Sequence, residues 1–340
     1  MLLQTIIFLV SLFFLVMGAD WFLKSAEKMG LAIGLSPFIV GVTIVSFGTS
    51  FPELFTAITA AFAGVTEIIP ANAIGSNIAN ILLVVGISAI VGGKLVVTKS
   101  LIDIDLPLLA IGTVILMGVI WPWEGGEAII TRWESVILLA TYGAYLLYTF
   151  FHQDERSFGE EDEEDKIPTR KERRKHIVVN IKKEKEIKER PKITLVDWIY
   201  LIGGGVALTF SAKYLIDSVI NISEILNVAV GVISIVGIAI GTSLPELIVS
   251  AKAAFNKKSE IALGNVFGSN VFNSFVVIGI PGIFTDINLD NPTFAIGLPI
   301  MILATLLFVI SGISRRIHNW EGIFFLSLYI IFVGKILGLF

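Results

Sequence analysis

The chain contains 340 residues, of which 55% are hydrophobic, and its mean hydropathy is +0.84. This composition excludes an ordinary soluble domain and indicates a protein that crosses a membrane many times. The net charge is −4, and charged residues of both signs are concentrated in one loop. We expect the lipid bilayer as a partner and no nucleic acid. No cysteine is present, which excludes disulfides and thiolate metal sites.

Ten apolar stretches approach the ~20 residues that a helix needs to cross a bilayer. They cover residues 2–23, 34–63, 71–92, 104–122, 131–151, 195–218, 228–255, 260–284, 291–312 and 319–339. The first stretch lacks a basic leader and a small-residue cleavage site, so we interpret it as a retained helix rather than a signal peptide. The sequence predicts an all-α membrane protein with ten transmembrane helices. Its parts are a first half at 1–152, a charged loop at 153–193 and a second half at 194–340.

The central loop contains an acidic run from Glu160 to Asp165 and a basic run from Arg170 to Lys175. This composition is typical of a solvated linker. A calcium sensor is the alternative, although the ligand spacing of an EF-hand is absent.

Basic residues gather in alternate loops, which predicts an orientation. Besides the central loop, these are Lys24, Lys28, Lys94, Lys99, Lys257, Lys258, Arg315 and Arg316. The intervening loops are mainly acidic, with Arg132 as an exception. We therefore expect a cell-membrane protein with both termini outside and the central loop in the cytoplasm.

Two motifs occur twice at one spacing. Gly48-Thr-Ser-Phe-Pro-Glu53 returns as Gly241-Thr-Ser-Leu-Pro-Glu246, and Gly75-Ser-Asn-Ile-Ala-Asn80 returns as Gly268-Ser-Asn-Val-Phe-Asn273. The intervals 246 − 53 and 273 − 80 are both 193 residues. A repeat of this length indicates a duplicated half-protein. Because each half has five predicted spans, the second half must enter the membrane from the opposite side, as in secondary transporters with inverted repeats.

Each first motif should break a membrane helix, because Pro52 and Pro245 have no N–H to donate. A carbonyl freed inside a membrane is costly unless it lines a polar cavity or binds a cation. A glutamate in a membrane span costs ~2.5–3.5 kcal/mol or more at the bilayer centre and is functional by default. Folding the halves together should bring the polar faces into one oxygen cage. The candidate residues are Glu53, Glu246, Thr49, Thr242, Ser50, Ser243, Ser76, Ser269, Asn77, Asn270, Asn80 and Asn273, with the carbonyls of Ser46 and Ala239.

An all-oxygen cage suits hard cations such as calcium and sodium, not zinc or copper. Two glutamates can neutralise one divalent or two monovalent ions. The alternative for the small polar residues is close packing and hydrogen bonding between helices.

The paired motifs resemble the two alpha-repeats of the sodium/calcium exchangers, in the calcium/cation antiporter superfamily, over essentially all ten spans. The resemblance implies that spans two, three, seven and eight form the site while spans one and six slide across them. It implies sodium/calcium exchange without a cofactor, and we expect function as a monomer. The implied calcium ligands are Glu53, Glu246 and the carbonyls of Thr49 and Thr242. The implied sodium ligands are Ser50, Ser76, Ser243, Ser269 and the carbonyls of Ser46 and Ala239, with Asn80 and Asn273 as central polar partners.

Asn273 separates subtypes within this resemblance. Some relatives, including potassium-dependent ones, carry an aspartate at this position, and an amide cannot supply a third negative charge. Calcium/proton exchange is the second choice, because the Gly-Asn-Ala-x-Glu type of motif is absent. A cation channel, which would also use carboxylates and carbonyls, is the alternative of a different class. An enzyme is not expected, because no nucleophile-and-base pair or phosphate loop appears.

Overall fold

The structure, a computed structural model, describes residues 2–98, 101–123, 125–126, 128–151, 191–225 and 243–336. The central loop lies almost wholly outside these residues. Two predicted ligands, Ala239 and Thr242, also lie outside them, together with the first half of the predicted seventh span.

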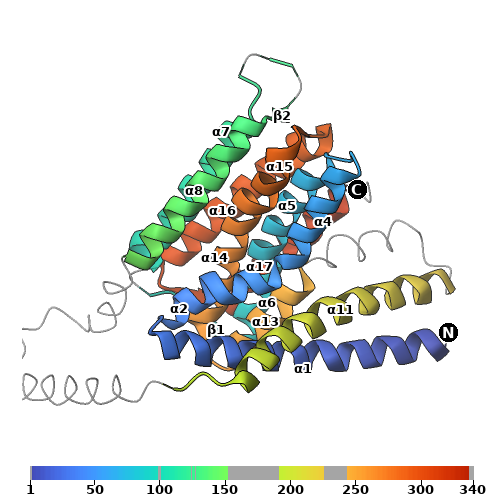
Figure 1. The fold of residues 1–340 in the computed structure, drawn as a ribbon, viewed down its shortest axis with the longest axis vertical. Helices are drawn as coiled ribbons and strands as arrows, with labels where there is room; N and C mark the ends of the chain where they lie inside the picture. Colours follow the sequence, from blue (N-terminus) through green and yellow to red (C-terminus); the bar gives the residue numbers. More distant parts are fainter. Residues whose placement is uncertain are drawn as a thin grey trace, which may run out of the picture.

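The described part of the chain is a bundle of long helices (Figure 1). The first half forms α1 (Leu2–Ile33), α2 (Pro37–Val40), the π-helix η1 (Gly41–Val45), α3 (Ser46–Thr49), α4 (Phe51–Phe62), α5 (Ile68–Ala79), η2 (Asn80–Val85), α6 (Gly86–Gly92), η3 (Leu101–Asp105), α7 (Leu106–Ile120) and α8 (Arg132–Phe151). The second half forms α11 (Leu195–Ile225), α13 (Leu244–Phe255), α14 (Ser259–Phe272), η6 (Asn273–Val277), α15 (Ile278–Phe284), η7 (Thr293–Gly297), α16 (Leu298–Ile313) and α17 (Asn319–Ile336).

The prediction of an all-helical membrane protein is confirmed. Among the described residues, eight helices are long and apolar enough to cross a membrane. The bent pair Pro37–Thr49 and Phe51–Phe62 makes a ninth span. The predicted seventh span is represented by α13, its described second half.

The predicted end of the first span, at residue 23, is too early. Helix α1 continues to Ile33 and stops before Gly34, whose φ is 87°. The hydropathy pattern predicts an end where charged residues begin. The helix continues because these charged side chains have ion-pair partners on other helices or loops. Lys28 Nζ donates to both carboxylate oxygens of Asp197 on α11, at 2.7 and 2.8 Å, and Lys258 pairs with Glu27.

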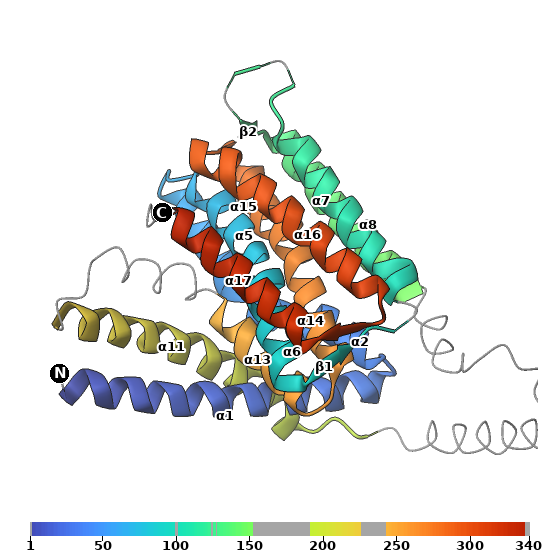
Figure 2. The ribbon, with the colours of Figure 1, turned by 180° about the vertical axis from the view of Figure 1, so that it is seen from behind.

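Two short ribbons establish how the halves are related. Strand β1 (Lys94–Val96) pairs with β4 (Arg316–His318), and β2 (Ile129–Ile130) pairs with β3 (Ile287–Asn288), both antiparallel. Strands β1 and β3 follow the third span of their halves, whereas β2 and β4 follow the fourth. The ribbons lie at opposite ends of the bundle, with β2 at the top and β1 at the bottom of both Figure 1 and Figure 2. Equivalent loops at opposite ends mean that the repeats are inverted.

Helices α1 and α11 form an antiparallel pair that crosses the rest of the bundle (Figures 1 and 2). Their backbones approach closely, because a Cβ atom at Gly18 would lie 2.9 Å from the Cβ of Ala207. Small residues at such a crossing are typical of membrane helices, where association depends on close packing.

The helices that carry the second motif form the centre of the bundle. Most residues of the span Ile68–Gly92 and of the span Ser259–Phe284 are buried, unlike those of the other spans. Helix η1 packs on α14 backbone to backbone, because a Cβ at Gly41 would lie 2.7 Å from the carbonyl oxygen of Ile261. The motif residues are therefore shielded from lipid.

Candidate cation site

Both proline motifs begin a new helix in the same way. Ser50 precedes α4 with φ −89° and ψ 5°, and Ser243 precedes α13 with φ −92° and ψ 8°. Proline then occupies the first turn of the new helix, where its missing N–H costs nothing. In the first half the break bends the span by 44°. The side chains after the break therefore point in other directions than they would on a continuous helix.

Glu53 and Glu246 lie third from the start of the new helices and are buried, with 0% and 1% of their surface exposed. The two motifs meet, because Ser50, three residues before Glu53, contacts Glu246. Among the described residues, neither oxygen of Glu53 has a hydrogen-bond partner, and Oε2 of Glu246 has none. Buried charges without partners are strongly unfavourable, so this pair requires protons or cations.

One hydrogen bond joins the two proline motifs. The Ser50 hydroxyl donates to Oε1 of Glu246 at 3.0 Å, from one repeat to the other. The equivalent hydroxyl of Ser243 has no hydrogen-bond partner within the described part of the chain. The two halves of the site therefore differ in this conformation.

Asn80 and Asn273 belong to the second motif, and they begin π-helices that contact α13 and α4, respectively. Both are buried, and no amide atom of either has a hydrogen-bond partner in the described ranges. Each begins a π-helical turn, η2 or η6, an irregularity that often occurs at functional sites. Ser76 and Ser269 are also buried, and the Ser269 hydroxyl is unpaired among the residues described.

The first half-helix ends in a network that includes residues absent from the predicted set. The Thr49 hydroxyl lies 3.3 Å from the Ser46 carbonyl and 3.1 Å from Oδ1 of Asn265, and Asn265 donates to the Ser250 hydroxyl at 2.8 Å. The Ser46 carbonyl also accepts from the Ser50 N–H at 2.9 Å. Asn265 repeats Asn72 at the spacing of 193, a signal that could have added it.

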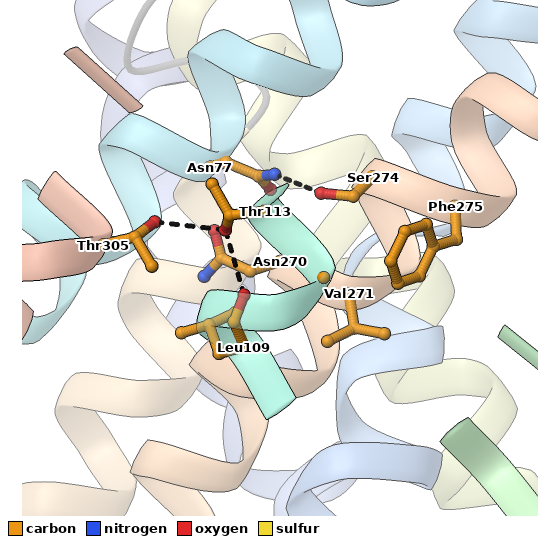
Figure 3. A pocket seen from close by; sticks show the side chains of 9 residues that line it. Asn77, Leu109, Thr113, Asn270, Val271, Ser274, Phe275 and Thr305 are labelled. Carbon is orange, nitrogen blue, oxygen red and sulfur yellow. Dashed lines mark hydrogen bonds between the residues drawn. The ribbon is translucent and has the colours of Figure 1, made fainter. Parts of the chain in front are cut away.

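Asn77 and Asn270 point toward a separate small cavity beside α7 and α16 (Figure 3). The Asn77 amide donates to the Ser274 hydroxyl at 2.8 Å, and the Asn270 amide donates to the Val266 carbonyl at 2.7 Å. These two predicted residues therefore belong to a different polar group from the two carboxylates.

The donor chemistry limits what the central site can bind. No cluster of three or more histidine, cysteine, aspartate or glutamate residues occurs in the described part of the chain. The site has two carboxylates, and hydroxyl, amide and backbone oxygens are its other donors. Such a set fits hard cations.

Inverted repeats with a buried carboxylate pair at two helix breaks define a membrane ion antiporter, not an enzyme. The sequence matches the model of the "Sodium/calcium exchanger protein" family over residues 3–151 and 196–337. The chain belongs to this family.

Relatives agree along nearly the whole length. The chain is 30% identical to the sodium/calcium exchanger MaX1 of Methanosarcina acetivorans, over 96% of this chain and 97% of MaX1. It is 30% identical to the putative antiporter CaxA of Alkalimonas amylolytica, over 97% of each. The fold is similar to that of the sodium-calcium exchanger NCX_Mj, with a TM-score of 0.73, 28% identity and 97% of each chain covered.

Proposed function

We propose that this protein exchanges sodium for calcium across the membrane by alternating access. The observation that carries the proposal is the buried pair Glu53 and Glu246, with three carboxylate oxygens unpaired among the described residues. With both carboxylates ionised the site has a charge of −2, which one calcium ion or two sodium ions balance. An unoccupied, ionised pair would repel itself within the bundle, so the loaded protein should change conformation more readily than the ion-free one.

The ligand roles follow the motif. Glu53 and Glu246 bind calcium, helped by the carbonyls of Thr49 and Thr242. Ser50, Ser76, Ser243, Ser269 and the carbonyls of Ser46 and Ala239 bind sodium, and Asn80 and Asn273 complete the centre. In support, Ser50 already contacts Glu246, and Thr49 ends the half-helix at the break. To bind sodium, the Ser46 carbonyl would give up at least one of its present hydrogen bonds.

The remaining parts of the proposal concern organisation. The functional unit is a monomer of two halves, 1–152 and 194–340, joined by a cytoplasmic loop at 153–193, with both termini outside. The names of MaX1 and NCX_Mj support sodium as the counter-ion. Calcium/proton exchange is the second candidate, because unpaired carboxylates can also carry protons. A channel is the third candidate, and inverted halves argue against it.

Calcium uptake into proteoliposomes tests the proposal. The vesicles would be loaded with sodium, potassium or choline, or would be given only a pH gradient. Each condition would be measured with the wild-type protein, with Glu53→Gln and with Glu246→Gln. We expect uptake only with internal sodium. Each variant removes one of the two carboxylates that neutralise calcium, and a buried charge without its partner costs about 3–5 kcal/mol. Calcium affinity should therefore fall more than a hundredfold.

Other outcomes would redirect the proposal. Uptake driven by a pH gradient alone would establish calcium/proton exchange. Uptake that needs no counter-ion would indicate a channel. Full activity of both glutamine variants would place the calcium site elsewhere.

A further inference from the structure

A second polar group lies between α7 and α16, outside the proposed ligand set for calcium and sodium. The hydroxyls of Thr113 and Thr305 lie 3.5 Å apart and line the small cavity of Figure 3 with Asn77 and Asn270. The interval 270 − 77 is 193 residues, the spacing of the motifs. The interval 305 − 113 is 192, which is also the interval between the Leu-Pro starts of α16 and α7 (298 − 106), so both pairs are repeat equivalents. Two equivalent residues that touch each other mark the pseudo-twofold axis between the halves.

The threonine hydroxyls and the asparagine amide nitrogens have acceptors in this structure. Thr113 donates to the Leu109 carbonyl at 3.0 Å, and Thr305 donates to the Met301 carbonyl at 2.9 Å. The amide nitrogens of Asn77 and Asn270 donate to the Ser274 hydroxyl and the Val266 carbonyl. The amide oxygens of the two asparagines take no part in these bonds.

Both amide oxygens require a donor. Oδ1 of Asn77 and Oδ1 of Asn270 have no hydrogen-bond partner in the described ranges. Water from outside does not reach them freely, because 3% or less of each residue is exposed. Figure 3 shows the two asparagines and the two threonines around the same cavity. A buried acceptor without a donor is unfavourable, so two of them favour binding of a small donor.

The size and charge of the cavity select the ligand. Its volume is about 10 Å³, close to that of one water site. Its lining contains asparagine, threonine, serine, glycine and apolar residues but no charged residue. A bare cation would have no counter-charge there, whereas water supplies two protons and needs two to four polar partners.

We propose that this cavity binds one structural water molecule, which bridges the two repeats on their axis. It donates one proton to Oδ1 of Asn77 and one to Oδ1 of Asn270, and a threonine hydroxyl can donate to it in place of its present backbone carbonyl. Asn77 and Asn270 each follow a motif serine and precede Asn80 or Asn273 by three residues. The water therefore positions both second motifs relative to each other, and Thr113 and Thr305 act as positioning residues.

An experimental structure of the purified transporter, at a resolution that shows ordered water, tests the site directly. We expect a density peak about 2.7–3.2 Å from both Oδ1 atoms. The peak should persist when choline replaces sodium in the buffer. The absence of a peak in both buffers would overturn the proposal, and so would a peak that requires sodium.

Matched variants test its role. Thr113→Val with Thr305→Val keeps the shape and removes the hydroxyls, whereas Thr113→Ser with Thr305→Ser keeps the hydroxyls. We expect the valine pair to lose the peak and to lower the exchange rate about tenfold, the effect of losing a buried hydrogen bond. The serine pair should keep both. Equal losses in the two pairs would mean that the threonine methyl groups matter, not the water. If the valine pair does not fold, the wild-type density decides.

Discussion

Glu53 and Glu246 occupy equivalent positions in the repeat but have different surroundings. Glu246 accepts a hydrogen bond from Ser50, while Glu53 has no hydrogen-bond partner among the described residues. The hydrogen bond stabilises one ionised carboxylate more than the other. Because inverted repeats exchange their conformations during alternating access, we expect the two glutamates to exchange these surroundings in the opposite-facing state.

Acid should inhibit calcium uptake by the wild type. As the pH falls, protons bind the carboxylates and remove the charge that attracts calcium, so the ionised form is present only on the alkaline side. We expect the initial uptake rate to fall from neutral to acid pH and to recover when external calcium is raised. Uptake rates over a grid of pH and calcium concentration measure this competition. A rate that is flat across the acid range would contradict it.

Asn273→Asp should change this pH profile. A third carboxylate near the other two makes it harder to ionise all three, because like charges repel. Half-maximal uptake should therefore move to higher pH by about one unit or more. Asn80→Asp is the matched variant in the other repeat and should shift the profile in the same direction. An unchanged profile in both would place these amides too far from the carboxylates to interact.

At the scale of elements, the site depends on a close crossing of η1 with α14. Gly41 and Gly264 allow it, since a Cβ at Gly264 would lie 3.1 Å from the Cα of Gly41 and would clash with the Phe38 carbonyl. A Cβ at Gly268 would likewise clash with the Val42 carbonyl. Because these atoms are backbone, the crossing cannot relax by moving a flexible side chain.

Gly264→Ala should therefore destabilise the protein. Overpacking of a well-packed interior costs about 1–3 kcal/mol, and separation of η1 from α14 should also lower the exchange rate. Gly143→Ala on α8 is the control, because no atom of the described residues lies within 4 Å of its added Cβ. Thermal unfolding in detergent and calcium uptake would be measured for both. Equal stability of the two variants would show that the crossing tolerates a methyl group.

At the scale of the whole molecule, α1 has two kinds of attachment. It packs closely on α11 through Gly18 and Ala207, and Lys28 binds Asp197 across the same pair. It is joined to α13 by polar contacts, including Asp20 with Lys252 at 3.2 Å. If α1 and α11 slide as one unit over the site helices, the first attachment persists and the second must break.

Cross-linking separates these attachments, and the chain has no native cysteine to interfere. A short bifunctional thiol reagent on Lys28→Cys with Asp197→Cys should leave calcium uptake close to that of the untreated variant. The same reagent on Asp20→Cys with Lys252→Cys should abolish uptake, and a cleavable reagent would allow recovery. Both pairs replace an ion pair of α1, so each controls for the other. Persistent uptake after the second cross-link would contradict sliding at this contact.

The sequence by itself determined the class of protein. Hydropathy is a local property of each stretch, and it predicted the helical membrane fold. The two motifs at one spacing of 193 residues, with an odd number of predicted spans per half, predicted inverted repeats. A carboxylate in an apolar stretch is also visible without coordinates, which is why Glu53 and Glu246 could be selected.

Only the tertiary structure decided which polar atoms meet. The chain bends at Ser50, and the Ser50 hydroxyl contacts Glu246 in the other repeat. Asn265 joins Thr49, and Thr113 meets Thr305, across more than 190 residues of sequence. Helix α1 extends to Ile33 because its charged end finds partners on α11 and at the start of α14. Such contacts depend on how distant helices pack and rotate, and no local pattern encodes that geometry.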